Sequence, residues 1–248
     1  MKRNIRLTIE YDGSRYQGWQ RLGGDSNANT IQGKLESVLS KMTGEDVNIN
    51  GSGRTDAGVH AYGQVANFHT DCMMSVNEIK DYLTKYLPSD ISIVEVSEAS
   101  ERFHSRLNAK EKTYLYRIAI PGVSNVFERK YLWYFPETLD IKKMEEAASL
   151  LIGTHDFKGF SSIKKTKKST VRSIYNIEIK KTKKEIQISY TGNGFLHNMV
   201  RILTGTLVEV GCGKIKPEDI TKALESTKRS DAGITAPPQG LFLVSVEY

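Results

Sequence analysis

The most chemically informative stretch of this sequence is a short segment that places one carboxylate between glycines. It reads Gly-Ser-Gly-Arg-Thr-Asp-Ala-Gly-Val-His over residues 51–60. Glycine permits backbone conformations that are closed to other residues, and it lets a ligand approach the main chain closely. Asp56 is therefore the first candidate for catalysis, and Arg54 adds a cation to the same loop.

Two nucleotide-binding patterns fail in this loop. The dinucleotide fingerprint requires a glycine at the position of Asp56. Gly53 and Gly58 have the spacing of a phosphate-binding loop, but Val59 and His60 replace the lysine and the serine or threonine that should follow. An ordinary tight turn with an exposed Asp56 remains the alternative to a catalytic loop.

Other catalytic classes lack their residue patterns. The five histidines have no metal-ligand spacing, and Cys72 and Cys212 lie far apart, so we predict no metal site. No Gly-x-Ser-x-Gly motif is present, and neither cysteine has the sequence context of an activated thiol. Carboxylate chemistry by Asp56 is what remains.

A second polar segment near the start of the chain is suited to binding a polyanion. Residues 11–20 read Tyr-Asp-Gly-Ser-Arg-Tyr-Gln-Gly-Trp-Gln. Bases can stack on such aromatic rings while Arg15 and Gln17 meet phosphate or sugar groups. The alternative is a turn whose rings fold back onto a sheet.

Two further candidates lie in the second half of the chain. Residues 112–117 alternate as a strand, so Tyr114 and Tyr116 share one face, either lining a pocket or packing on a helix. A helix expected over residues 194–210 places Arg201 nearly opposite its apolar side. Arg201 is then either a solvated helix charge or a guanidinium that meets an anion across a cleft.

The elements that must position these residues follow one order twice. The first half predicts strands at 5–11, 46–50, 62–69 and 91–97 and helices beginning at Asn29 or Thr30 and at Ser75. The second half predicts strands at 112–120, 171–180, 185–191 and 241–247 and helices at 140–152, 194–210 and from Pro217. We therefore predict an α+β protein with two similar βαββαβ, ferredoxin-like units, residues 1–105 and 106–248, whose antiparallel sheets join around a central cleft.

The charge of the chain is concentrated in its second half. Residues 1–105 hold 11 Lys and Arg against 14 Asp and Glu, whereas residues 106–248 hold 24 against 15. A basic half indicates a polyanionic partner. The clusters Lys164–Lys168 and Lys180–Lys184 are also typical of solvated loops and hairpin turns.

The sequence favours a protein of a reducing compartment without membrane contact. No apolar stretch approaches the roughly 20 residues of a membrane helix, and the N-terminus runs directly into a strand pattern. Two distant cysteines fit the cytoplasm.

Five motifs, in order, resemble the tRNA pseudouridine synthase A family, and together they cover nearly the whole chain. They are residues 11–20, 53–61, 112–117, 153–157, and 195–201 with 205–207. The resemblance implies an isomerase that converts uridine to pseudouridine at positions 38, 39 and 40 of the tRNA anticodon stem-loop. It also implies a cytoplasmic homodimer that uses no cofactor and no metal.

The same resemblance implies roles for individual residues. By motif, Asp56 is the nucleophile, Tyr114 stacks on the target base, Arg201 pairs with Asp56, and Arg54 contacts RNA and helps to hold the base extruded. The uracil must leave the stack, turn and rejoin the ribose through C5. Three routes stay open: an adduct at the sugar C1′, an adduct at the base C6, or a glycal intermediate.

Three alternatives to this interpretation stay open. The same chemistry on ribosomal RNA fits the motifs, and a non-catalytic RNA-binding module fits the aromatic and basic segments. A hydrolase of a small phosphorylated substrate fits least, because the sequence lacks a metal cluster and a phosphate loop.

Overall fold

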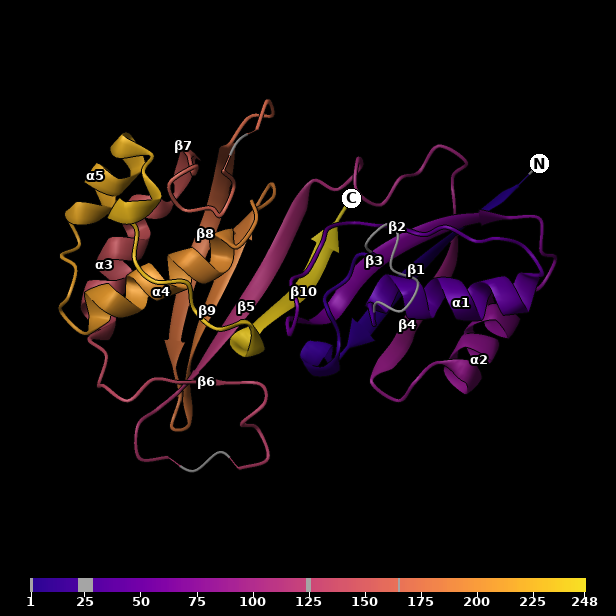
Figure 1. Ribbon diagram of the computed structural model, residues 1–248, viewed down its shortest axis with the longest axis horizontal. Coiled ribbons are helices and arrows are strands. Elements are labelled where there is room, and N and C mark those ends of the chain that lie inside the picture. Colours follow the sequence, from indigo (N-terminus) through magenta and orange to yellow (C-terminus); the bar gives the residue numbers. More distant parts are fainter. Residues whose placement is uncertain (1, 22–28, 124–125, 165) are drawn as a thin grey trace. The chain divides into compact units, whose positions relative to one another are not determined.

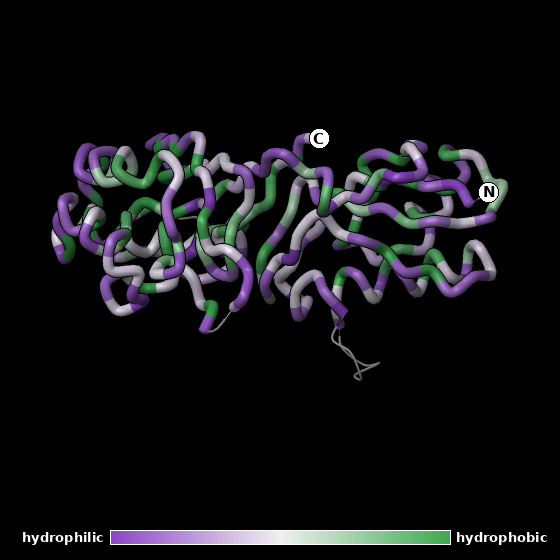
Figure 2. The backbone as a smooth tube through the Cα atoms, turned by 90° about the horizontal axis from the view of Figure 1, so that it is seen from above, coloured by the Kyte–Doolittle hydropathy of each residue, from purple (hydrophilic) through white to green (hydrophobic). Residues whose placement is uncertain are grey.

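The computed structural model describes residues 2–21, 29–123, 126–164 and 166–248. The chain forms two compact units (Figure 1). Unit 1 comprises Met1–Lys110 with Phe242–Tyr248, and unit 2 comprises Glu111–Leu241. Hydrophobic and hydrophilic residues alternate along the chain of each unit (Figure 2), as expected for elements with one buried face.

Unit 1 is a sheet with two helices. Its elements are β1 (Arg3–Tyr11), η1 (Gly13–Arg15), α1 (Ile31–Thr43), β2 (Asn50–Gly51), β3 (His60–Thr70), α2 (Val76–Tyr86), β4 (Ile91–Ala99) and β10 (Leu241–Glu247). Strand β1 pairs antiparallel with both β3 and β4. Strand β2 pairs antiparallel with β3, and β10 runs parallel to β3.

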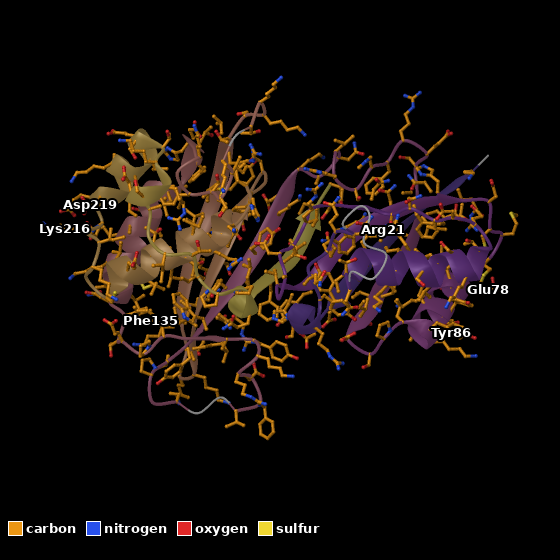
Figure 3. The ribbon with its side chains drawn as sticks, in the orientation of Figure 1. Arg21, Glu78, Tyr86, Phe135, Lys216 and Asp219 are labelled. Carbon is orange, nitrogen blue, oxygen red and sulfur yellow. The ribbon has the colours of Figure 1, made fainter. Side chains whose placement is uncertain are left out.

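Capping residues fix both helices of unit 1. The Thr30 side chain accepts a hydrogen bond from the Gly33 N–H at the start of α1, and Gly44 ends that helix in the left-handed conformation. Ser75 and Glu78 form the predicted capping box of α2, the helix on which Glu78 and Tyr86 are labelled in Figure 3. The predicted helix starts are therefore confirmed.

Unit 2 is also built from paired strands and helices. Its elements are β5 (Glu111–Ala119), β6 (Trp133–Tyr134), α3 (Ile141–Leu151), β7 (Gly153–Asp156), β8 (Val171–Lys181), β9 (Glu185–Gly192), α4 (Met199–Gly211), α5 (Asp219–Ser226), η2 (Arg229–Asp231) and η3 (Pro238–Gly240). Strand β9 pairs antiparallel with β5 and β8, and β7 pairs antiparallel with β8. Strand β6 runs parallel to β5.

The strand predicted at 46–50 is wrong for most of its length, since only Asn50 and Gly51 pair with β3. The buried carboxylate of Glu36 accepts from the Ile49 N–H at 3.1 Å, and Ser40 Oγ accepts from the Val47 N–H at 3.0 Å. Side chains of α1 thus take backbone donors that a strand ladder would use.

The helix predicted at 194–210 begins five residues later, at Met199. Gly194 has φ +155 and Asn198 has φ 60, and neither conformation belongs in an α-helix. Phe195 consequently precedes the helix instead of lying on its apolar side. Arg201 is the third helical residue, in the first turn.

The final strand also differs from its expected place. The sequence predicts it within residues 106–248, but Phe242 and Leu243 pair with His60 and Ala61 of β3 and so belong to unit 1. The predicted α+β class is confirmed. The junction of the two sheets around a cleft stays a prediction, and so does the division of the chain into a half with the Asp56 loop, residues 1–105, and a basic half, residues 106–248.

Candidate functional site

The Asp56 loop joins β2 to β3 in unit 1. The Val59 N–H donates to the Asp56 carbonyl at 3.2 Å, and Gly58 completes that turn with φ +77, a conformation that favours glycine. Asp56 is half-buried and Arg54 is exposed. The segment contains a turn, but the turn alternative expected an exposed Asp56 and this residue is half-buried, so a catalytic role for the loop stays a prediction.

Segment 11–20 packs against this loop. The Trp19 N–H donates to the Thr55 carbonyl at 3.0 Å, and the Tyr11 hydroxyl lies 2.8 Å from Thr55 Oγ1. The peptide that leads into Asp56 is therefore fixed through both its backbone and the preceding side chain.

The aromatic rings of segment 11–20 do not face a ligand. Tyr11, Tyr16 and Trp19 are all buried, so the predicted stacking of bases on these rings is wrong and the alternative is confirmed. Their hydrophobic area drives them onto the sheet. Arg15 and Gln17 are exposed, so they keep the orientation expected of substrate-binding residues.

A buried histidine links the same segment to β3. His60 Nδ1 accepts from the Gly13 N–H at 3.0 Å and lies 3.1 Å from Asp12 Oδ1, while its ring stacks on Phe242. This contact holds η1 against the strand that leaves the Asp56 loop. Histidine spacing in the sequence tests only for a metal site, so it does not reveal this structural contact.

The two tyrosines of β5 have different surroundings in unit 2. Tyr116 is fully buried, and its hydroxyl donates to the Pro237 carbonyl at 2.7 Å. Burial raises the pKa of the Tyr116 phenol well above its usual value. Tyr114 is buried next to Phe195, with ring centroids 5.2 Å apart in an edge-to-face arrangement. Tyr116, with an exposed fraction of 0%, is therefore a core residue, whereas Tyr114 keeps an exposed fraction of 8%, and its stacking on a base stays a prediction.

Arg201 is held rigidly at the start of α4. Its Nε donates to the Ala236 carbonyl at 2.7 Å, and Nη1 donates to Asn198 Oδ1 at 2.8 Å. The side chain is half-buried, so it is not a solvated helix charge. A helix N-terminus carries positive partial charge, and the guanidinium adds to it, so this position suits an anion.

The structure distributes the predicted site residues over both units. Arg15, Gln17, Arg54 and Asp56 belong to unit 1, where the first segment packs on the second. Tyr114 and Arg201 belong to unit 2. The predicted ion pair between Asp56 and Arg201 stays a prediction.

The two lysine clusters differ in their surroundings. Lys164, Lys167 and Lys168 line an open hollow beside β7 and β8, whereas Lys165 lies outside the described residues. Residues 180–184 surround the turn between β8 and β9, where Lys180 pairs with Glu178 at 2.9 Å. The first cluster is the better candidate for holding a phosphate.

Two negative findings concern the part of the chain that the structure describes. There, no three His, Cys, Asp or Glu side chains gather in a way that would hold a metal ion. None of the helices in the same ranges has the length and apolar character needed to cross a membrane.

The chain matches known proteins along nearly its whole length. Residues 7–108 and 147–248 match the family described as tRNA pseudouridine synthase. "tRNA pseudouridine synthase A 2" of Bacillus anthracis is 50% identical over 245 residues, 99% of each chain. "tRNA pseudouridine synthase A 1" of Clostridium tetani is 51% identical over 246 residues, which cover 99% of this chain and 100% of that one.

Similarity to solved structures is distant. The structure titled "Crystal Structure of a Cbf5-Nop10-Gar1 Complex" aligns with a TM-score of 0.37 and 10% identity, over 97% of this chain and 58% of that chain.

Proposed function

Because the chain belongs to the tRNA pseudouridine synthase family, we propose that it isomerises uridines 38, 39 and 40 of the tRNA anticodon stem-loop with Asp56 as the nucleophile. The family converts uridine to pseudouridine in tRNA, so the chain is an isomerase. The observation that carries the residue assignment is the family match, because its two ranges include both the Asp56 loop and the start of α4. Tyr114 lies between those ranges, so its role depends on the motif at residues 112–117.

The reaction conserves all atoms of the nucleotide. The bond from N1 to the ribose C1′ breaks, a bond from C5 to C1′ forms, C5 loses a proton and N1 gains one. The Asp56 carboxylate attacks C1′ or C6, or removes a proton to give a glycal, and each route needs an ionised carboxylate. In the predicted ion pair, the Arg201 guanidinium and the positive end of α4 balance the negative charge of the carboxylate.

The remaining residues bind the substrate. Tyr114 stacks on the extruded uracil, which offsets part of the few kcal/mol that unstacking costs. The exposed side chains of Arg54, Arg15 and Gln17 contact RNA, with the guanidiniums on phosphates. The lysine-lined hollow of unit 2 adds a contact to the backbone of the anticodon arm.

We also propose that the protein works as a homodimer in the cytoplasm, where its tRNA substrate is present. The isomerisation is redox-neutral and the uracil stays in the pocket throughout, so the mechanism needs no cofactor.

Tritium release from tRNA labelled at uridine C5 tests this function. Anticodon stem-loops that carry a single uridine at position 38, 39 or 40 should each release tritium, and mapping should place pseudouridine at that position. Release from ribosomal RNA but not from tRNA would establish the ribosomal alternative. Tight tRNA binding without any product would establish the non-catalytic module.

A further inference from the structure

We propose that Gln64 and Tyr11 are positioning residues that hold the main chain of the Asp56 loop in its working shape. The inference rests on the proposed role of Asp56. Neither residue belongs to the predicted set of site residues, and both are almost completely buried, with exposed fractions of 0% and 3%.

Gln64 lies in β3, and both ends of its amide bind the loop. Oε1 accepts from Ser52 Oγ at 2.6 Å, and Nε2 donates to the Gly53 carbonyl at 3.1 Å. Burying an amide without such partners costs several kcal/mol, so a buried glutamine requires these bonds. The first half of the loop is therefore tied to the central strand of unit 1.

Tyr11 holds the second half of the loop. Its hydroxyl lies 2.8 Å from Thr55 Oγ1, directly before Asp56 in the sequence. Burial raises the pKa of the Tyr11 phenol above its usual range, so the hydroxyl keeps its proton as a hydrogen-bonding group. Two strands, β1 and β3, thus fix the loop on both sides of Arg54.

Close packing accompanies these hydrogen bonds. A Cβ atom on Gly18 would lie 2.6 Å from the Thr55 carbonyl oxygen, and one on Gly51 would lie 2.5 Å from Trp19 Nε1. No side chain fits at either place without moving the loop or the segment packed on it. This close packing therefore limits movement of the Asp56 loop relative to segment 11–20.

Rigid placement matters because a displacement of about 1 Å can reduce the rate of a catalysed step about 100-fold. Gln64 and Tyr11 are buried inside unit 1, so they do not supply a surface for RNA. Their loss should lower kcat and leave tRNA affinity nearly unchanged.

The test measures single-turnover pseudouridine formation, tRNA Kd and Tm for Tyr11→Phe and Gln64→Met. Each variant should lose about 10- to 100-fold in kcat and change Kd by less than about twofold. Tyr190→Phe is the matched control, because the buried Tyr190 hydroxyl lies 2.9 Å from Thr204 Oγ1 in unit 2. It should lower Tm as Tyr11→Phe does, with kcat within about threefold of the wild type.

Thr55 provides a second pair of variants if Gln64→Met fails to fold. Thr55→Ser keeps the hydroxyl and should keep most of kcat, whereas Thr55→Val removes it and should lose as much as Tyr11→Phe. Equal kcat in Thr55→Ser and Thr55→Val would overturn the inference. So would losses that Tyr190→Phe reproduces, since these would reflect stability alone.

Asp56→Asn, measured in parallel, separates this inference from the proposed function. An active Asp56→Asn would refute the nucleophile, and the positioning role with it. An inactive Asp56→Asn beside wild-type kcat in Tyr11→Phe and Gln64→Met would refute only the positioning role.

Discussion

The Asp56 loop of unit 1 and the start of α4 in unit 2 each present a charge, but they are fixed in different ways. Around Asp56 the main chain and the preceding side chain are bound, by Trp19 and Tyr11. At the start of α4 the guanidinium of Arg201 is itself bound, by Ala236 and Asn198.

This difference suits the two proposed roles. A nucleophile must meet the substrate through its own atoms, and the contacts to the main chain and side chain of Thr55 fix the position from which Asp56 starts. An electrostatic partner needs a fixed direction, and a guanidinium has enough donors to bind its own support and an anion together. Substitutions in both regions should therefore lower activity. Near Asp56 they act through the contacts of the main chain and of Thr55, and at the start of α4 they act through the guanidinium of Arg201.

Of the substitutions that distinguish the two regions, we expect the one at Arg201 to reduce kcat most. Arg201→Gln should lower kcat about 100- to 1000-fold, because a fixed charge near the reacting groups is lost. Arg229→Gln is the matched control, since Arg229 binds the Ala232 and Gly233 carbonyls of the same unit. It should stay within about threefold of the wild type in single-turnover assays. Similar losses in both variants would show that Arg201 acts by supporting the fold.

The next effect tests the packing of the Asp56 loop. Gly18→Ala should lower kcat at least about 10-fold and the free energy of unfolding by about 1–3 kcal/mol, because Gly18 has φ +97 and its Cβ would strike the Thr55 carbonyl. Gly44→Ala has similar strain, with φ +73, but open space around it. Urea unfolding should show a loss for both variants, whereas only Gly18→Ala should lose activity. Full activity in Gly18→Ala would show that the loop tolerates displacement.

A smaller effect is expected from the lysines of unit 2. Replacing Lys167 and Lys168 by glutamine should raise KM about 3- to 10-fold and reduce the slope of log KM against log salt concentration by about one for each lysine that contacts a phosphate. The same change at Lys183 and Lys184 should raise KM less than about twofold, because that cluster surrounds a hairpin turn. Assays at several salt concentrations measure both pairs. The reverse order would assign RNA binding to the hairpin.

The smallest effect concerns pH and should be alike in the two units. Burial raises the pKa values of Tyr11 and Tyr190 above the usual value of about 10. The unfolded chain therefore loses these protons first, and the free energy of unfolding falls as the pH rises above about 10. Tyr11→Phe and Tyr190→Phe should each flatten that decline in urea titrations from pH 8 to 11. An unchanged slope would contradict the assigned burial.

Capping and periodicity predicted most of the fold, because they are local. Thr30, Gly44 and the Ser75 capping box carry their signals within a few residues. The strand at 46–50 failed because a distant carboxylate, Glu36, takes its backbone donor. No local pattern indicates such a contact.

The site was only partly predictable for the same reason. The motif around Asp56 predicts the reacting carboxylate, the family resemblance implies Tyr114 and Arg201 as its partners, and these roles stay predictions. The sequence does not indicate a role for Gln64, because a polar residue in a strand usually faces solvent. In the structure Gln64 is buried and binds Ser52 and Gly53. Both faces of β3 are buried in the folded structure, and the sequence pattern alone does not indicate this.

The most direct test of the account is single-turnover pseudouridine formation by Asp56→Asn. The substitution keeps the size of the side chain and removes the carboxylate, and Asp46→Asn, at an exposed position before β2, is the control. Asp56→Asn should bind tRNA within about threefold of the wild type and form at least about 1000-fold less product, because the nucleophile is lost, while Asp46→Asn remains fully active. Product formation by Asp56→Asn at the wild-type rate would contradict the central claim.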